Sequence, residues 1–282
     1  MGARRDARCF RGGDDVVAAA QSRLSKGVLM YRRVRNRIIF RNCNVSFRNL
    51  NNADTVAAFP DLGLVFNRVK KAGNTTVLSF LWGISASSSM GGASSTRDIK
   101  KSVLTPMRAS YHEAASMRNY TRVAVVRNPY DRVLSAFLNK VAPGDLYEES
   151  RKRHFKVVPG WGMESPDGFA RFVDFLGAGG LYHNRHWWPQ RDLLIMPPDK
   201  FDVIGKLETL PEDMARVLKL IGRDPLLARS LATPHPLEAS QPYKITGATS
   251  KRAAYYTPEL AATVRRLYAA DFETFGYPDD CD

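Results

Sequence analysis

Residues 62–81 read LGLVFNRVKKAGNTTVLSFL, and this stretch decides the fold. Its opening apolar run, at 62–66, predicts a short buried strand. A polar turn that contains Gly73 follows, and Thr75 or Thr76 is placed to cap a helix whose apolar side carries Val77, Leu78 and Leu81. Strands that alternate with helices in this way build parallel α/β sheets, so the stretch predicts that architecture.

The turn at 68–76 also has the chemistry of an anion-binding loop. Backbone N–H groups at a helix N-terminus point toward a bound anion, and the helix dipole adds to the attraction. Two lysines and two threonines supply further donors. The order of a Walker loop is absent, because the lysines precede the only glycine. Taken alone, the segment fits a phosphate cradle and an ordinary polar turn equally well.

A second stretch, residues 123–137, reads VAVVRNPYDRVLSAF. Its β-branched start predicts a strand covered on both faces, and a helix is expected from about Tyr130. Arg127 would then lie at the carboxyl end of a strand, where open α/β sheets bind ligands, with Ser135 about two helical turns further on. A guanidinium near a hydroxyl suits a phosphate monoester. In isolation, however, a strand cap and a packed serine explain the pair better.

The rest of the chain continues the alternation. A third strand is predicted at 201–205, a capping box at 209–212 opens the next helix, and one further helix is expected from Thr257 to Phe272. Loops are predicted at 85–96, 142–168 and 223–250. The fold class is therefore α/β, with a central parallel sheet flanked by helices.

Charge is unevenly distributed along the chain. The sequence has 42 basic and 28 acidic residues, a net charge of +14, and residues 1–50 hold 12 basic and 3 acidic residues, or +9 of that total. Such an excess favours a polyanionic partner: nucleic acid, an acidic membrane surface, a nucleotide, or a sulfated or uronic sugar. We interpret residues 1–60 as a basic N-terminal extension and residues 61–282 as the folded domain. A solvated basic segment explains the extension better than a dedicated nucleic-acid-binding arm.

Cysteine usage and hydropathy predict the compartment. Cys9, Cys43 and Cys281 are far apart and form no C-x-x-C pair, which argues for a reducing environment and against a zinc ribbon. No apolar run approaches the ~20 residues that cross a bilayer. Two aspartates precede the short apolar run at 16–20, so the N-terminus is a poor signal peptide. These features predict a cytoplasmic protein.

Together, the two stretches resemble the cofactor-binding signatures of the sulfotransferases, and most closely those of the carbohydrate sulfotransferases of the chondroitin/dermatan and HNK-1 type. The likeness lies in Lys-Ala-Gly-x-Thr-Thr at 71–76 and Arg-x-Pro-Tyr-x-Arg-Val-x-Ser-Ala-Phe at 127–137. Residues 184–190, 201–210 and 267–277 are similar to three further segments of that family. The resemblance runs from about residue 62 to 277 and implies a single sulfotransferase domain with a P-loop-like fold.

The resemblance implies that the donor is 3′-phosphoadenosine 5′-phosphosulfate (PAPS). Lys71 and the turn after it would hold the 5′-phosphosulfate, and Arg127 and Ser135 would hold the 3′-phosphate. The family usually has proline where Lys70 stands, so both lysines are candidates; Lys71 is favoured because it keeps the register with Gly73. The expected donor-binding residues are Lys70, Lys71, Ala72, Gly73, Asn74, Thr75, Thr76, Arg127 and Ser135.

The implied reaction is in-line attack of an acceptor hydroxyl on sulfur, with 3′,5′-ADP as the leaving group. Lys71 would stabilise charge on the bridging oxygen. The general base is expected to be His186, in a segment similar to the family's HW-x-P-Q, or His112, which lies between the two donor signatures. His183, Glu113 and Glu208 are further candidates. The sequence shows no metal-ligand cluster, and the reaction needs no metal.

Two other classes of function remain open at this stage. A P-loop-like kinase shares the phosphate-cradle logic but lacks a Walker loop and an obvious magnesium carboxylate. A non-enzymatic basic protein that binds polyanions would rest on the N-terminal charge. For the sulfotransferase interpretation, the partner is a carbohydrate hydroxyl, with an anionic glycan favoured by the positive charge, and no nucleic acid is expected. Membrane association stays open, because eukaryotic members of the family are usually Golgi type II membrane proteins.

Overall fold

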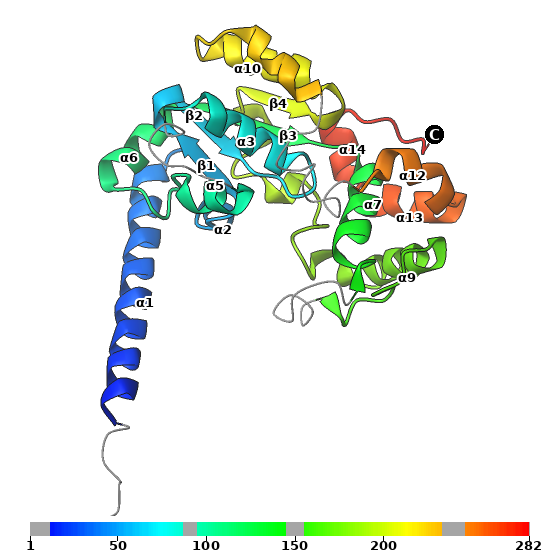
Figure 1. The fold of residues 1–282 in the computed structure, drawn as a ribbon, viewed down its shortest axis with the longest axis horizontal. Helices are drawn as coiled ribbons and strands as arrows, with labels where there is room; N and C mark the ends of the chain where they lie inside the picture. Colours follow the sequence, from blue (N-terminus) through cyan, green and yellow to red (C-terminus); the bar gives the residue numbers. More distant parts are fainter. Residues whose placement is uncertain (1–11, 87–94, 145–154, 233–245, 282) are drawn as a thin grey trace, which may run out of the picture.

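The computed structural model describes residues 12–86, 95–144, 155–232 and 246–281. Four strands form its central sheet, in the order β1-β2-β3-β4 (Figure 1). Their bounds are Val56–Phe59, Leu64–Asn67, Thr121–Val126 and Val203–Lys206. Strands β2, β3 and β4 are parallel to one another. The α/β class is therefore confirmed, and the three strands predicted from the sequence are present with small shifts of their ends.

The predicted sheet is wrong in one respect, because its first strand runs antiparallel to the second. Residues 60–62 form a 3-10 turn, and Gly63, with φ 56°, returns the chain beside β1. So short a connection joins antiparallel neighbours only, since a parallel crossover needs a dozen or more residues. The sheet thus begins at Val56, inside the segment that the sequence assigned to an N-terminal extension.

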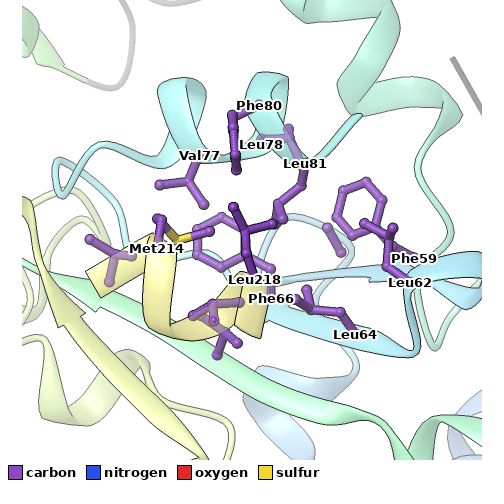
Figure 2. Packing of buried hydrophobic residues seen from close by; sticks show 14 of the residues in the cluster. Phe59, Leu62, Leu64, Phe66, Val77, Leu78, Phe80, Leu81, Met214 and Leu218 are labelled. Carbon is purple, nitrogen blue, oxygen red and sulfur yellow. The ribbon is translucent and has the colours of Figure 1, made fainter. Parts of the chain in front are cut away.

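Both faces of the sheet are covered by apolar side chains. Leu64 and Phe66 of β2 pack beneath helix α3 (Asn74–Ile84), where the predicted apolar side is confirmed, and beside helix α10 (Leu210–Leu220) (Figure 2). The intervening Val65 faces the opposite layer, which also receives the end of helix α1 (Gly12–Phe40). Side chains alternate between faces along a strand, so one strand contributes to two cores.

A group of helices packs to one side of the sheet around aromatic side chains (Figure 1). It consists of α7 (Pro129–Lys140), α9 (Pro166–Gly177), α12 (Ala248–Tyr255), α13 (Pro258–Leu267) and α14 (Ala269–Phe275). The single helix predicted for 257–272 is in fact two, broken at buried Tyr268, whose hydroxyl donates to the carbonyl of Trp187. A tertiary contact ends α13 at a point where the helical sequence pattern continues.

Two of the predicted helix starts differ in how they are capped. The start predicted at Thr257 is confirmed, and the Thr257 side chain caps α13 by accepting from the amide of Leu260. The capping box at 209–212 does not form, because the Thr209 hydroxyl instead donates to the carboxylate of Asp213 at 2.9 Å. The other α-helices are α2 (Phe47–Leu50), α5 (Thr96–Ser102) and α6 (Tyr111–Ser116). The remaining 3-10 turns are Met117–Asn119, Gly180–Tyr182, Arg191–Leu193, Pro198–Lys200, Leu207–Thr209 and Pro225–Ala232.

Candidate functional site

The carboxyl ends of the three parallel strands meet at one edge of the sheet. Lys71 follows β2, Arg127 follows β3 and Glu208 follows β4. This edge is where open α/β sheets bind their ligands. The structure therefore brings the two predicted anion-binding segments to adjacent strand ends of one sheet.

The turn between β2 and α3 has an unusual backbone. Lys71 has φ 67° and Gly73 has φ 63°, both in the left-handed region. For a lysine this conformation costs about 1–2 kcal/mol, so the surrounding structure must hold it. A Cβ at Gly73 would lie 2.6 Å from Cδ1 of Leu207, which follows β4. The positive φ favours glycine at position 73, and any larger residue would also have to displace the Leu207 side chain. The predicted Thr cap is not the observed one, because Gly73 itself occupies the N-cap position of α3.

Arg132 links the two signatures, although the sequence pattern assigned it no role. Its side chain comes from α7 and is fully buried. Nε donates to the carbonyl of Lys70 at 2.9 Å, and Nη1 donates to the carbonyl of Trp188 at 2.7 Å. Nη2 is buried with no hydrogen-bond partner among the described residues. Burial lowers the pKa of this guanidinium. Through this one arginine, the second signature is tied to the turn of the first.

Three cations lie at the β2 end of the site with little to neutralise them. Burial, together with the positive charges of Arg68 and Arg185, lowers the pKa of the Lys70 ammonium to about 8, while Asp54 opposes the shift. Arg68 is 2% exposed, and its Nη1 has no hydrogen-bond partner in the described chain. None of the ion pairs between described residues joins Arg68, Lys70 or Arg132 to a carboxylate. Buried cations that lack a carboxylate partner favour an anionic ligand.

The Arg127 end of the site is completed by a segment that the sequence analysis missed. Arg127 Nη2 donates to Thr249 Oγ1 at 3.2 Å, and the Ser135 and Thr246 hydroxyls lie 3.1 Å apart. Thr249 lies in the first turn of α12 and Thr246 lies just before the helix, in a region predicted to be irregular. The run Thr-Gly-Ala-Thr-Ser at 246–250, followed by lysine and arginine, was the available signal, because hydroxyls and a glycine at a helix start are typical of phosphate loops.

Asp131 balances the charge at this end. Its Oδ2 accepts from the Thr249 hydroxyl at 2.8 Å and lies 4.0 Å from Arg127 Nη2. Its Oδ1 lies 3.8 Å from Nη1 of Arg252 on α12. Burial lowers the pKa of Arg127, and Asp131 opposes that shift. The guanidinium is thus held in place by a carboxylate and a hydroxyl.

The three other family-like segments hold the backbone around Arg127. The Gln190 side chain forms a two-sided clamp, accepting from the Arg127 amide at 2.9 Å and donating to its carbonyl at 2.8 Å. Glu208 accepts from the amide of Asn128 at 2.7 Å and from the Tyr277 hydroxyl at 2.9 Å. Asp271, from the C-terminal segment, accepts from the amide of Gln190. Glu208 therefore serves as a structural carboxylate, and we drop it as a general base.

His186 lies beside the β2 turn. Burial lowers its pKa well below the ordinary value, and the positive charges of Lys140, Lys70 and Lys71 act in the same direction. Nδ1 lies 2.7 Å from Oδ1 of Asn184, an oxygen that also accepts from the His186 amide. An amide oxygen only accepts, so Nδ1 carries the proton and Nε2 is the basic nitrogen. The ring is thus neutral and oriented.

His112 lies elsewhere. It is exposed on α6, which precedes β3 at the amino edge of the sheet. Strand β3 has six residues, a length of roughly 20 Å, so the carboxyl edge is at least that far along the strand. The neighbouring Glu113 is engaged in a capping box with Ser110. The structure does not bring either residue to Lys71.

The two tryptophans of this region differ in their surroundings. Trp187 is fully buried among aromatic rings, and its Nε1 donates to the carbonyl of Gly180. Trp188 is contacted by two guanidinium groups, with Arg48 4.5 Å and Arg185 5.2 Å from its ring centre. These distances are typical of cation–π contacts. Trp188 therefore packs against two arginines near the turn after β2, and its ring is not exposed for stacking on a sugar.

Fold and site together define an α/β protein with two linked cationic segments at one sheet edge. The family model described as the sulfotransferase family matches residues 54–278, so the chain belongs to the sulfotransferase family. Carbohydrate sulfotransferase 12 of Xenopus laevis is 28% identical over 189 residues, which are 59% of this chain and 42% of the relative. Carbohydrate sulfotransferase 10 of Homo sapiens is 27% identical over 245 residues, 76% of this chain and 64% of the relative. The chain thus spans 42–64% of the length of these relatives. No solved structure gives a significant match.

The relatives correct the predicted location. The sequence pattern indicated a cytoplasmic protein, but the relatives are carbohydrate sulfotransferases, the class whose eukaryotic members are usually Golgi membrane proteins. The cytoplasmic prediction is therefore wrong, because it treated the lack of a visible anchor as evidence. Within the described residues, the structure contains no helix with the length and hydropathy needed to cross a membrane.

Proposed function

We propose that this chain transfers a sulfuryl group from PAPS to a hydroxyl group of a carbohydrate. The observation that carries the proposal is Arg132, which joins two cationic segments at adjacent strand ends. PAPS bears anionic groups at both ends, a 5′-phosphosulfate and a 3′-phosphate, and two linked sites match that arrangement. The nitrogens of Arg68 and Arg132 that lack a hydrogen-bond partner among the described residues support an anionic ligand at the β2 end.

In this proposal the donor residues divide between the two ends. The turn from Lys71 to Thr76 and the N-terminus of α3 would hold the 5′-phosphosulfate. Arg127 and Ser135 would hold the 3′-phosphate, with the Thr246 hydroxyl beside Ser135 as a further donor, while Thr249, which accepts from Arg127 and donates to Asp131, would position the guanidinium. The bound donor supplies an activated sulfuryl group.

The residues at the β2 end have separate tasks in the transfer. His186 would accept the proton of the acceptor hydroxyl at Nε2, since Nδ1 is committed to Asn184. A depressed pKa keeps this imidazole neutral at pH 7, which a base requires. As the new oxygen–sulfur bond forms and the bridging bond breaks, the Lys71 ammonium would stabilise charge on the leaving oxygen. The proton thus ends on His186 and the electron pair on 3′,5′-ADP.

We further propose that the acceptor is an anionic glycan. Arg48 and Arg185 lie on Trp188 close to the turn, and Arg185 has its pKa lowered by burial and by Arg48. Guanidinium groups bind carboxylates and sulfates through paired donors. Replacing both arginines with glutamine should raise KM for an acidic glycan about tenfold or more and leave KM for a neutral one unchanged. Equal loss for both acceptors would reject this part of the proposal.

Ligand stabilisation tests the donor assignment. At a 3′,5′-ADP concentration of ~100 times Kd, the folded state should gain about 2.7 kcal/mol, and ATP–Mg²⁺ at the same concentration should give less. Greater stabilisation by ATP–Mg²⁺ than by 3′,5′-ADP would favour a kinase. Transfer of radiolabelled sulfate from PAPS to a panel of glycans tests turnover, and Lys71→Ala and Arg127→Ala should each abolish it. Full activity of either variant would remove that residue from the proposed site.

A further inference from the structure

Helix α1 carries a row of exposed apolar side chains along its described part. Met30, Tyr31, Val34 and Ile38 are 69%, 64%, 48% and 59% exposed. Their spacing of three and four residues places them on one face of the helix. Monomeric soluble proteins seldom expose such a continuous apolar row, so the row indicates a binding surface.

The opposite face fixes the helix to the domain. Ile39 and Phe40 are buried in the layer behind the sheet. The buried Arg35 guanidinium donates to the carbonyls of Pro106 and Ala109. These contacts lie in the last turns of α1, while the preceding turns extend away from the sheet (Figure 1). The apolar row is therefore held in a fixed orientation on a projecting rod.

The projecting part is apolar on more than one side. Val28 and Leu29 are 47% and 43% exposed, and they precede Met30 and Tyr31 directly. Four consecutive residues of a helix point in four directions, about 100° apart. Over residues 28–31, large apolar side chains are therefore exposed to solvent around the whole circumference of the helix.

Charge identifies the partner of this surface. Residues 16–53 contain eight arginine and lysine residues and no aspartate or glutamate. Lys26, Arg33, Arg37 and Arg41 are exposed, and Arg33 and Arg37 run in a row beside Val34 and Ile38. A second copy of α1 would bring like charges together along the shared surface. An anionic lipid surface attracts these cations and accepts the apolar side chains below its headgroups.

We propose that α1 binds the surface of an anionic membrane, with Met30, Tyr31, Val34 and Ile38 inserted among the lipids and the cations among the headgroups. This is peripheral binding in the plane of the bilayer. It needs both contributions, because either a short apolar row or a basic patch by itself gives weak attachment. The inference is independent of the proposed sulfuryl transfer, since it uses no residue of the sheet edge.

Vesicle flotation of the full chain tests this proposal. Vesicles of phosphatidylcholine with about 30% phosphatidylglycerol should bind the protein, and pure phosphatidylcholine should bind it much less. The triple substitution Met30→Gln, Val34→Gln and Ile38→Gln should weaken binding ~10-fold or more while keeping helix propensity. Substituting Leu226→Gln and Leu227→Gln, which are 57% and 43% exposed elsewhere on the surface, is the matched control and should change nothing.

A charge variant provides the second arm. Arg33→Gln with Arg37→Gln should weaken binding roughly fivefold per cation, and added salt should weaken the wild type in the same way. Circular dichroism and the thermal midpoint confirm folding, which exposed substitutions seldom disturb. Undiminished vesicle binding by the triple variant would overturn the proposal. So would a concentration-dependent dimer of the wild type that binds no vesicles and that the triple variant abolishes.

Discussion

Replacing Arg132 with methionine tests the link on which the proposed donor site depends. The guanidinium donates to the carbonyls of Lys70 and Trp188, and it is fully buried. Methionine has a similar reach but no donor. The substitution therefore removes both hydrogen bonds while filling much of the same space.

The structure bounds the expected magnitude. Two carbonyls that lose their donor cost about 1–3 kcal/mol each, or roughly 2–6 kcal/mol together. Methionine is uncharged, so the variant avoids the cost of desolvating a cation on folding, and this offsets part of the loss. We expect a net destabilisation of about 1–4 kcal/mol. The freed turn at Lys70 and Lys71 should bind 3′,5′-ADP at least ~10-fold more weakly, a difference of about 1.4 kcal/mol.

Calorimetric titration with 3′,5′-ADP measures the affinity, and denaturant unfolding measures the stability. Arg216→Met is the matched control, because this arginine side chain is 66% exposed, and an ion pair made by an exposed side chain, here with Asp213, contributes about 0–1 kcal/mol. Arg132→Lys should fall between wild type and methionine, since an ammonium cannot reproduce the planar two-donor contact. A folded Arg132→Met protein that binds 3′,5′-ADP within about twofold of wild type would refute the reasoning.

Four further predictions concern the same sheet edge. Lys70 has its pKa lowered to about 8 in the folded protein, so 3′,5′-ADP binding should weaken as pH rises through 8, and Lys70→Arg should remove that decline; titrations from pH 7 to 10 decide this. Lys70 keeps its proton to about pH 10.5 in the unfolded chain but loses it near pH 8 in the folded protein, so its contribution to the unfolding free energy rises with pH between these values. Lys70→Met should abolish this slope in denaturant unfolding measured across that pH range. Gly73→Ala should cost about 1–3 kcal/mol in unfolding free energy, because φ is 63° and the new Cβ would meet Leu207; an unchanged denaturation midpoint would contradict the strained turn. His186→Ala should lower kcat ~100-fold or more while His112→Ala leaves it unchanged, and the wild-type rate should show no inflection near pH 6.5; the reverse ranking in steady-state assays would exchange the two roles.

Interpreting the N-terminal segment as an extension shows where sequence reasoning was too coarse. The basic charge of residues 1–50 favours a polyanionic partner, but the apolar row on α1 can be recognised as exposed only because the tertiary structure buries the other face of the helix. The β1 strand at Val56–Phe59 was missed for a related reason. Four residues ahead of a proline carry little periodicity of their own, and their partner in β2 decides their conformation.

The sequence alone determined the features that depend on interactions between residues close together in the chain. The β2–turn–α3 unit, the β3 strand and the chemistry of the two donor signatures are local, because strand and helix periodicity and turn composition act over a few positions. Tertiary structure decided which side chains meet. Arg127 and Thr249 are 122 residues apart, Arg127 and Gln190 are 63 apart, and Arg132 and Lys70 are 62 apart. Contacts of that span form only when parallel strands align their carboxyl ends, and no local pattern records them.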